Sequence, residues 1–576
     1  VNNTLVNNGA KFSGALGTEI ERSAFDLKWR DMTTCSVGAL YPIMFEEVIP
    51  GDKFKIDTAI TSIMQPSIYP TCDDIVADVH YFYCPFRVLW TNFRKFVGEE
   101  IPSDYDDQES LVMPYFEVGG GATENFVAVG DLMDRLGVQP GVRVEGANSL
   151  PYRMYRLTWN EWYRSSEIQD PVLVDRDADV DSEYIPYLLK VNRFKDYFSS
   201  CLPRPQAASE PAIIPLTGLA HVLPDSSFSN YTGESDQMFY ANLDSGSLST
   251  LSGNKVLGTN MFAASSFSNN LPSNFEISGY AVPRNLAVNF DNQINAIGST
   301  VTALRQAVAT QRFLEASQRG GYRYRELIKA HYGSEIPDST AQIPQFLGGA
   351  RFNINMAANV QTSANSGDQA AGSLSGVSIT REKDFGINEH VFSEHGMVMG
   401  FISFRVLNHT YQQGCPRFFF KKSKFDLYWP EFSRISEQPV YKGELYLNQS
   451  GFIGVGNDNF EPFGYNESYA EYRYHPSRLS GQVRRSFELR SLSPWTYADY
   501  YTRQPTLSSS WLTEPRENVD DTLTYIGEET SERPSTLPDV YYYDNGLVDQ
   551  FVVDIAFKIR AERPMPLYGI PGLDVI

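Results

Sequence analysis

A strict alternation of residue types near position 555 constrains the fold of this chain more than any other feature. Its apolar members are Phe551, Val553, Ile555, Phe557 and Ile559. Asp554, Lys558 and Arg560 occupy the other phase, so a period of two separates an apolar face from a charged one. This is the pattern of a β-strand with one face in a core and one face in water. Pro564 and Pro566 follow, and because proline cannot donate to a sheet ladder, the strand is expected to leave its sheet there.

Other segments also have strand patterns. Residues 53–63 alternate in the same way, and residues 75–84 and 396–407 are apolar on both faces, which predicts buried strands. Helical spacing is limited to residues 159–164, 302–316 and 324–332, the last two joined by Gly320 and Gly321. Strands that lie far apart in sequence, with long excursions between them, are typical of a jelly roll with decorated loops rather than a hairpin meander.

Composition agrees with short strands and elaborate loops. The 576 residues are 42% apolar, enough for a large core, and include 34 Tyr, 36 Phe, 42 Gly and 33 Pro. Arg405 interrupts the longest apolar run, so no membrane insertion is expected. The opening residues VNNTLVNNGAKFSG lack a basic start and an apolar core, so they predict no secretory signal. The five cysteines, Cys35, Cys72, Cys84, Cys201 and Cys415, form no CxxC pair and are expected to be reduced core thiols.

Catalytic motifs are absent from the sequence. No GxSxG, GxxxxGK[ST], HExxH or dinucleotide fingerprint occurs, and the glycines of GFIGVG have the wrong spacing. The one local cluster of possible metal ligands is Glu389, His390, Glu394 and His395, for which a solvated loop is the stronger interpretation. We therefore expect no enzyme activity, no metal and no cofactor.

Seven stretches combine aromatic residues, Arg and Pro in a way that suits packed interfaces. They are RSAFDL (22–27), FEEVIPGDKF (45–54), YRMYRLTWNEWYR (152–164), DYFSSCLPRPQ (196–206), RGGYRYRELIKAHYG (319–333), EYRYHPSRLSG (471–481) and RPMPLYGIPG (563–572). In this order they resemble the major capsid protein of gokushoviruses, the small icosahedral single-stranded DNA bacteriophages of the Microviridae. The resemblance spans roughly residues 20–576. Arg204 departs from the family pattern, in which Trp is frequent at that position.

The resemblance implies a mainly β fold: a single eight-stranded viral jelly-roll barrel with long decorated loops, a few short helices and a large surface insertion. Residues 1–20 would be an internal N-terminal arm. Residues 21–206 and 290–576 would form the two parts of the jelly-roll domain, with a C-terminal arm from about residue 561. Residues 207–289, rich in Ser, Gly and Asn, read from composition as a long solvated loop. The family resemblance implies instead a surface insertion that builds a protrusion at the threefold axes and binds the host.

The net charge of −22 limits how the chain could hold DNA, because phosphates are repelled by an acidic wall. Either basic residues are concentrated on the inner face, or a small basic partner neutralises the genome. Basic residues lie beside aromatic ones in residues 417–429 and 472–490, where both phosphate contact and base stacking are available. The DNA-binding candidates are Lys421, Lys422, Lys424, Arg484 and Arg485. The competing interpretation of these stretches is a subunit interface, since Arg and aromatic residues are also enriched there.

The remaining expectations concern assembly. The interface candidates are Tyr152, Arg153, Trp159, Trp162, Arg473, Arg478, Arg563, Pro564, Tyr568 and Pro571. The family comparison implies a T=1 virion capsid, assembled in the bacterial host cytoplasm around a circular single-stranded DNA genome. Its partners would be copies of itself, a small basic internal DNA-binding protein, a pilot or minor capsid protein and a host receptor. The alternative is a monomeric glycan-binding β-sandwich on a cell surface, which size-exclusion chromatography would distinguish.

Overall fold

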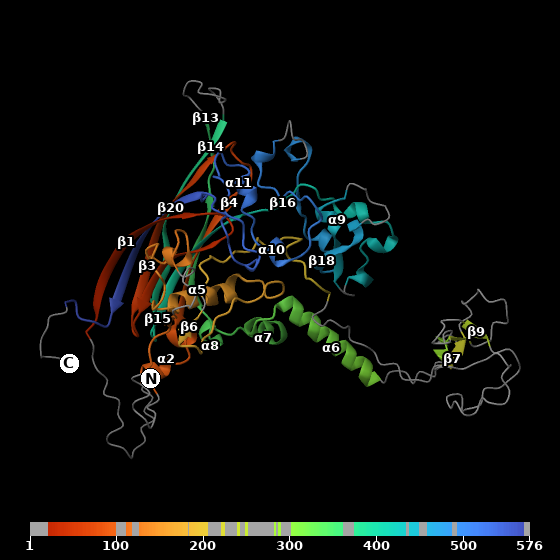
Figure 1. The fold of residues 1–576 in the computed structure, drawn as a ribbon, viewed down its shortest axis with the longest axis horizontal. Coiled ribbons are helices and arrows are strands. Elements are labelled where there is room, and N and C mark those ends of the chain that lie inside the picture. The colour runs from red at the N-terminus through yellow and green to blue at the C-terminus, as the bar shows by residue number, and fades with distance from the viewer. Residues whose placement is uncertain are drawn as a thin grey trace, which may run out of the picture. The chain divides into compact units, whose positions relative to one another are not determined.

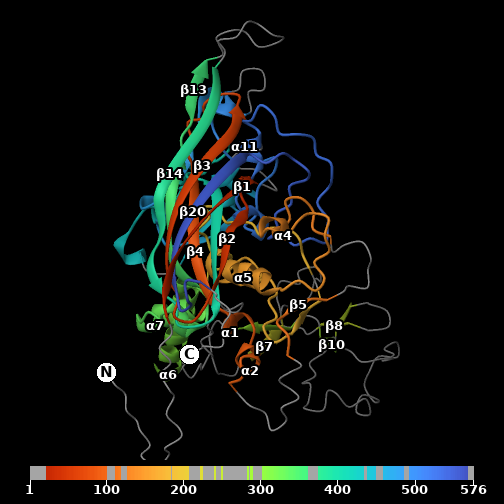
Figure 2. The same ribbon diagram turned by 90° about the vertical axis from the view of Figure 1, so that its left-hand side faces the viewer.

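Two antiparallel sheets contain the long strands of the protein (Figures 1 and 2). The computed structural model describes residues 21–99, 111–117, 126–182, 184–205, 301–360, 374–433, 437–448, 458–485 and 492–568, with short strands between 221 and 289. The first sheet has the order β1 (Ser23–Cys35), β20 (Phe551–Arg563), β3 (Lys53–Ser67), β14 (Leu374–Val391) and β13 (Ala357–Val360). The second has the order β12 (Gln345–Ile354), β4 (Ile75–Pro85), β15 (Gly396–Val406) and β2 (Leu40–Val48).

The strands predicted from sequence are confirmed. β20 alternates as expected, with Phe551, Val553, Ile555, Phe557 and Ile559 buried and each at most 2% exposed. It continues three residues beyond the predicted end, to Arg563, because Ala561 still packs in the core and pairs with both β1 and β3. The C-terminal segment therefore leaves the sheet at Pro564 rather than near residue 561. β3 alternates, while β4 and β15 are buried on both faces.

The inward faces of the two sheets share one apolar core. Phe551 of β20 stacks on Phe404 of β15 with ring centroids 4.4 Å apart. The Thr58 hydroxyl of β3 and the Tyr81 hydroxyl of β4 are 2.6 Å apart, which satisfies both polar groups inside the core. Closely packed side chains from both sheets therefore make the architecture a β-sandwich.

The long strands mostly alternate between the sheets along the chain. β1 is followed by β2, β3 and β4 in turn, each in the opposite sheet from the one before. Two long excursions interrupt the series, residues 86–344 between β4 and β12 and residues 407–550 between β15 and β20. Within the larger unit, the described parts of these excursions consist mainly of loops and short elements, for which the sandwich is the scaffold.

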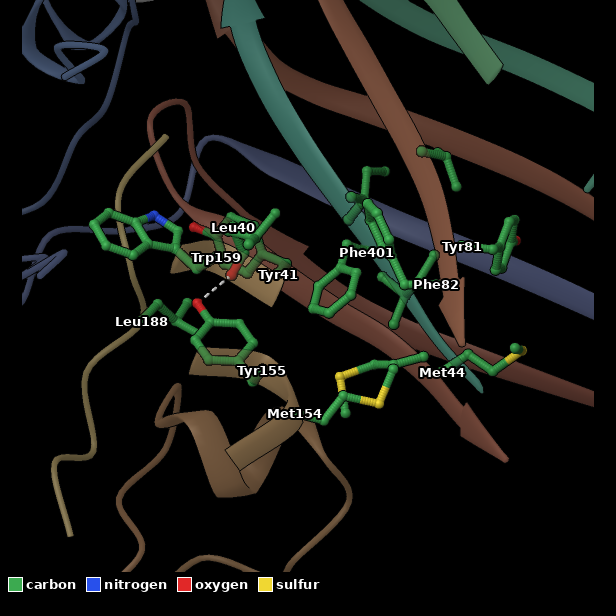
Figure 3. Packing of buried hydrophobic residues seen from close by; sticks show 14 of the residues in the cluster. Leu40, Tyr41, Met44, Tyr81, Phe82, Met154, Tyr155, Trp159, Leu188 and Phe401 are labelled. Carbon is green, nitrogen blue, oxygen red and sulfur yellow. Dashed lines mark hydrogen bonds between the residues drawn. The ribbon is translucent and has the colours of Figure 1, made fainter. Parts of the chain in front are cut away.

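One excursion contributes a helix to the core (Figure 3). α5 (Leu150–Thr158) continues into a single π-helical turn, Trp159–Tyr163. The turn overlaps the predicted helix at 159–164, but the helical segment begins nine residues earlier. The Tyr155 hydroxyl donates to the carbonyl of Leu40 (2.8 Å) and accepts from the Leu189 amide (2.8 Å). These bonds attach the helix to β2 and to the segment that contains Leu189.

The other predicted helices are also present. α6 (Val301–Gly320) is longer than the predicted 302–316, and α7 (Tyr324–Tyr332) matches its predicted bounds. The remaining short elements of the excursions are α1 (Phe86–Leu89), α2 (Phe93–Phe96), β5 (Tyr115–Phe116), α4 (Leu132–Arg135), β6 (Val180–Asp181), α8 (Asp338–Ala341), β16 (Thr410–Tyr411), β17 (Gln438–Tyr441), α9 (Lys442–Leu445), β18 (Pro462–Asn466), β19 (Ser477–Arg478), α10 (Ser509–Leu512) and α11 (Glu517–Asp520). No helix in the described ranges is both long enough and apolar enough to cross a membrane.

The chain divides into two units, Ala208–Glu315 and the rest. Within the smaller unit the described strands are β7 (His221–Pro224), β8 (Phe239–Ala241), β9 (Leu248–Thr250), β10 (Val282–Pro283) and β11 (Leu286–Asn289). β8 pairs with β9 and β10, and β7 pairs with β11. The expected insertion, 207–289, falls mostly on residues outside the described ranges, as does the N-terminal arm, 1–20.

The cysteines only partly match the expectation of core thiols. Cys35, Cys84 and Cys201 are buried, and burial raises the pKa of the Cys84 thiol to about 12. Cys72 is exposed and Cys415 is half-buried, because both lie in loops outside the sandwich.

Candidate assembly and nucleic-acid surface

Residues 417–432 form an exposed aromatic surface on the second excursion. The segment forms three short 3-10 turns, Arg417–Phe420, Lys424–Asp426 and Pro430–Phe432, of which the first follows Pro416 and the third begins at Pro430. The Asp426 carboxylate accepts from the amides of Ser423 (2.6 Å) and Lys422 (2.8 Å), which lowers the pKa of Asp426 and fixes the middle turn.

Except for the buried Phe420, the aromatic side chains of the turns are exposed. The exposed members of this surface are Phe418, Phe419, Phe425, Leu427, Tyr428, Trp429 and Phe432, together with Tyr472 and Tyr474 of the neighbouring segment. Phe418 is 72% exposed. Tyr428 joins the two segments, with its ring centroid 5.1 Å from that of Tyr469 and 6.1 Å from that of Tyr472. Contiguous exposed aromatic side chains on this scale are typical of association sites.

Three of the five predicted DNA-binding cations lie on this surface. The Lys421 ammonium forms an ion pair with Glu471 at 2.7 Å and lies 4.3 Å from the Tyr472 ring centroid. Burial opposes its charge, but the contacts with Glu471 and Tyr472 outweigh burial and raise the pKa of Lys421. Lys422 lies 4.9 Å from the ring of Phe460, and Lys424 lies 5.0 Å from the ring of Phe425. Among the described residues neither of these two has a carboxylate partner, so both are available to a phosphate.

Arg484 and Arg485 have partners from other segments. Arg484 donates two hydrogen bonds to the carbonyl of Leu479, at 3.0 and 2.8 Å. Arg485 is 2.5 Å from Asp521 and lies over the ring of Tyr500. The three lysines thus lie beside rings of the aromatic surface or its neighbours, whereas Arg484 and Arg485 contact Leu479, Asp521 and Tyr500.

A cavity of about 490 Å³ opens beside the aromatic surface. Aromatic and proline side chains contribute to its wall, including Phe198, Tyr411, Phe418 and Tyr474. Arg417 and Glu444 form an ion pair in it at 2.7 Å, and Tyr197 donates to Glu444 at 3.0 Å. Burial raises the pKa of Glu444 despite the neighbouring guanidinium.

The interface candidates in residues 152–164 are buried within the subunit. Tyr152, Arg153 and Trp159 are 2%, 1% and 0% exposed. Arg153 pairs with Asp181 at 2.8 Å, and the Trp159 indole donates to the carbonyl of Lys190 at 2.7 Å. Their partners lie inside the same chain, so these three side chains have almost no exposed surface for contact with a second subunit. Trp162 is half-buried, donating to Pro344 and lying under the Arg325 guanidinium at 4.2 Å.

The other interface candidates occupy two places. Arg473 is exposed and pairs with Glu467, and Arg478 is exposed in β19. Arg563 ends β20, where it lies over the Phe54 ring at 5.1 Å and near Asp52 at 3.8 Å. Pro564 is half-buried and Tyr568 is 74% exposed. Pro571 lies outside the described residues.

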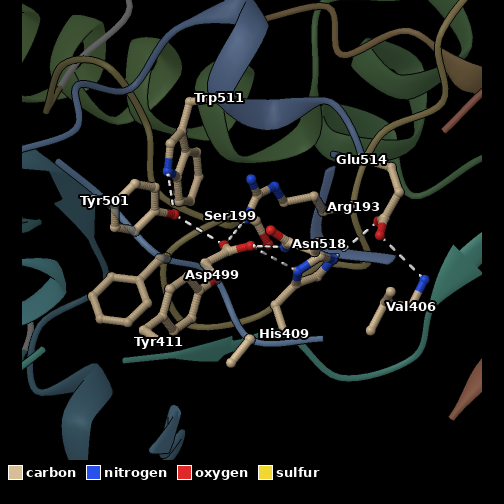
Figure 4. Close-up of polar contacts among 12 residues, drawn as sticks. Arg193, Ser199, Val406, His409, Tyr411, Asp499, Tyr501, Trp511, Glu514 and Asn518 are labelled. Atoms are coloured by element: carbon tan, nitrogen blue, oxygen red, sulfur yellow. Dashed lines mark hydrogen bonds and ion pairs between the residues drawn. The ribbon is translucent and has the colours of Figure 1, made fainter. Parts of the chain in front are cut away.

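A buried polar cluster anchors the second excursion, and sequence patterns do not reveal it (Figure 4). Asp499 pairs with Arg193, and its carboxylate also accepts from Asn518 and from the Tyr501 hydroxyl. His409 lies between two carboxylates, 2.9 Å from Glu514 and 3.7 Å from Asp499. Burial opposes protonation of His409, but the two carboxylates outweigh it and raise its pKa to about 9. Ion pairs in this cluster therefore join three segments that lie far apart in the sequence.

The Glu-His cluster has structural partners. Glu389 pairs with Lys53 at 2.9 Å, Glu394 pairs with Arg87, and the His390 ring packs on Phe392. In the part of the chain that the structure describes, no group of three metal-ligating side chains converges.

A β-sandwich with a broad exposed aromatic surface belongs to the class of proteins that work by association. The family model for the phage capsid protein (F protein) matches residues 14–573, and the chain belongs to that family. It is 30% identical to capsid protein VP1 of Chlamydia phage 1 and to that of Spiroplasma virus 4, in each case over 98% of this chain and 97% of the relative. It is 29% identical to capsid protein VP1 of Bdellovibrio phage phiMH2K, over 96% of this chain and 95% of the relative.

These matches confirm the resemblance to Microviridae capsid proteins, which are bacteriophage virion components. The family is structural rather than enzymatic.

Proposed function

We propose that the chain is the major capsid protein of a small T=1 icosahedral shell that encloses a circular single-stranded DNA genome. The observation that carries this proposal beyond family membership is the exposed aromatic surface of residues 417–432. A subunit that kept these side chains in water would be prone to association, and a second subunit gives them a dry partner. Assembly would take place in the bacterial host cytoplasm.

The strand order supports a viral jelly roll. Eight long strands form two four-stranded sets, β1–β20–β3–β14 and β2–β15–β4–β12. Successive strands change sheets except between β4 and β12, as in a barrel made by rolling up one long hairpin. β13 adds a short fifth strand to the first sheet.

Lys421, Lys422 and Lys424 are the cations that we propose contact DNA. A phosphate could approach Lys422 and Lys424 while an unpaired base stacks on a neighbouring ring. Arg484 and Arg485 remain candidates, with their contacts to Leu479 and Asp521 in competition. Three cations cannot neutralise a genome inside a shell with a charge of −22 per subunit. A small basic internal protein would supply most of the neutralising charge, and a pilot or minor capsid protein would complete the particle.

Residues 207–289 are proposed as a surface insertion that binds the host receptor. Deleting residues 226–273 and closing the gap with a short linker should leave assembly intact and abolish adsorption to host cells. Normal adsorption by the deleted particles would remove the receptor role.

The main test is the size of the purified full-length chain. A capsid protein should elute as a megadalton particle on size-exclusion chromatography and appear as uniform shells by electron microscopy. A stable 65 kDa monomer under the same conditions would contradict the proposal and favour the glycan-binding sandwich.

A further inference from the structure

β1 leaves one edge of the first sheet open. It pairs with β20 on one side only. Near its C-terminal end the other side is covered, because Arg135 donates to the Thr33 hydroxyl (2.5 Å) and to the carbonyl of Thr34. From Ser23 to Asp31, no described residue outside β20 hydrogen-bonds to the backbone of the strand. A long strand with unpaired backbone groups is a template for another strand.

The apolar face of β1 is also incomplete. Phe25, Leu27 and Trp29 point to the core side but are only half-buried. Their neighbours in β20, Phe557 and Ile559, are 2% and 0% exposed. Trp29 packs on Phe557 with ring centroids 4.4 Å apart, so it already belongs to the core on one side. A strand added beyond β1 would cover the exposed side of these residues.

The sequence of this open stretch is complementary to itself. In an antiparallel pair of two copies with the twofold axis at Leu27, residues equidistant from Leu27 face each other. Asp26 then faces the partner's Lys28, and Lys28 faces the partner's Asp26. On the core side Phe25 faces the partner's Trp29, and Leu27 faces the partner's Leu27. Each of these is a favourable cross-strand pair.

The charges inside the subunit favour the same arrangement. Lys28 lies directly opposite Lys558 of β20, and like charges opposite each other destabilise a sheet. Asp26 and Lys28 are both exposed, and neither forms an ion pair with any described residue. A carboxylate on the open side of Lys28 would offset the repulsion from Lys558. A register centred on Lys28 instead would place Lys28 against itself, which is unfavourable.

We infer that β1 is a self-pairing edge through which two capsid subunits join antiparallel about Leu27. This inference rests on the proposed self-assembly and assigns one of its contacts. The joined sheet would continue across a twofold axis, which makes the contact isologous and closed. Main-chain hydrogen bonds would supply affinity, and the Asp26–Lys28 pairs would set the register.

Charge reversal tests the register. Asp26→Lys and Lys28→Asp each convert two attractive pairs into two repulsive ones, and each should weaken subunit pairing about ten-fold. The double variant exchanges the charges and should recover pairing to within about two-fold of wild type. Pairing is measured by sedimentation of the full-length chain under assembly conditions. The melting temperature of the unassembled chain is followed in parallel, because Arg560 and Lys558 face the two positions within the subunit. Recovery in the double variant supports the inference; equal loss in all three overturns it.

A cysteine pair tests the geometry independently. In a Cys72→Ser background, Leu27→Cys should give a disulfide-linked dimer on mild oxidation, because the two residues 27 face each other across the axis. Ala24→Cys is the matched control, since the two copies of residue 24 would lie about 20 Å apart. Shells that form normally while Leu27→Cys gives no dimer would overturn the strand pairing and leave the capsid function intact. A wild-type chain that forms no particles would instead contradict the capsid function. If residues 1–20 of the same chain cover β1, the charge variants change the melting temperature of the unassembled subunit and no dimer forms, which also overturns the inference.

Discussion

Residues 150–163 and residues 417–432 have similar compositions but opposite environments. Both combine aromatic residues with basic ones, and both lie in excursions that begin after a long strand of the second sheet. In the first segment Tyr155 and Trp159 are 0% exposed and have hydrogen-bond partners within the subunit. In the second, Phe418 and Tyr428 are 72% and 49% exposed. Composition thus indicates that a segment packs against something, but not whether the partner is its own chain or another.

Local geometry explains the difference. α5 presents side chains around a whole helical turn and lies against β2 and the chain near Leu189, so its aromatic residues meet the core. The 3-10 turns at 417–432 are too short to present a continuous inward face. Most of their aromatic side chains therefore remain on the surface, whereas Phe420 is buried against Tyr441 and Phe460.

The largest expected effect tests whether the burial of a position determines how strongly a substitution there affects folding. Ile555→Asp places an unpaired carboxylate at a position that is 0% exposed, and should cost several kcal/mol and prevent folding. Val552→Asp is the matched control, because Val552 lies on the same strand but is 42% exposed. Soluble yield and circular dichroism of the two variants give the comparison. Equal yields would contradict the inward assignment of Ile555.

The next effect compares the two aromatic segments directly. Tyr155→Ala removes a buried ring and leaves the Leu189 amide and the Leu40 carbonyl unpaired, so it should cost about 3–5 kcal/mol. Tyr428→Ala should change the stability of the unassembled subunit by no more than about 0.5 kcal/mol while lowering the yield of assembled shells. Denaturant unfolding measures the first quantity and sedimentation the second. A large loss of subunit stability in Tyr428→Ala would place that segment in the subunit core.

A third effect is the pH dependence of stability that comes from buried His409, in contrast to the exposed lysines of the aromatic surface. The pKa of His409 is about 9 in the folded chain and near 6.5 when unfolded, so folding favours the protonated form. The stabilisation is complete below pH 6.5 and is lost as the pH rises through 9, about 3 kcal/mol in all. The charged groups that face His409 are Glu514, Asp499 and Arg193, with Asp73 farther away.

Denaturant unfolding between pH 6 and 10 checks this expectation. The wild type should lose more stability than His409→Gln over this range, because the glutamine does not titrate. Parallel pH profiles for the two proteins would rule out a charged His409.

The smallest effect is on DNA. Replacing Lys422 and Lys424 with Gln should leave subunit stability unchanged and reduce the salt dependence of binding to a single-stranded oligonucleotide. The loss of two phosphate contacts should reduce the magnitude of the slope of log K against log salt by about 1.4. Lys329→Gln with Lys442→Gln is the control, because these lysines already pair with Glu335 and Glu461. A similar slope change in both double variants would remove the specific role of Lys422 and Lys424.

Sequence patterns predicted the strands with regular alternation or continuous apolar character. β20, β3, β4 and β15 were accessible in this way, since the side-chain period directly reflects burial. β14 was not predicted, and its irregular pairing explains why. Its register with β3 shifts between Glu382 and Phe385, where Asp384 has a positive φ of 63°. A bulge of this kind breaks the period of two.

β1 shows a different limit. Phe25, Leu27 and Trp29 alternate with Asp26, Lys28 and Arg30, so the strand signal was present but was interpreted only as an interface stretch. Lys421, Lys422 and Lys424 could be grouped from the sequence because they are neighbours there, and their contact with DNA stays a prediction. The His409 cluster could not be found, because Arg193, His409 and Asp499 are brought together only by the fold.

The position of β20 in the first sheet has a consequence for biosynthesis. β20 lies between β1 and β3, and Arg30 on β1 contacts Asp554 on β20 across 524 residues of sequence. At ribosomal rates of about 5–20 residues per second, synthesis reaches β20 on the order of a minute after β1, and until then no strand lies between β1 and β3. During that interval the nascent chain has no continuous first sheet to offer a neighbour. The first sheet can therefore form in full only after synthesis has reached β20, and a chain that ends before β20 lacks the strand that joins β1 to β3.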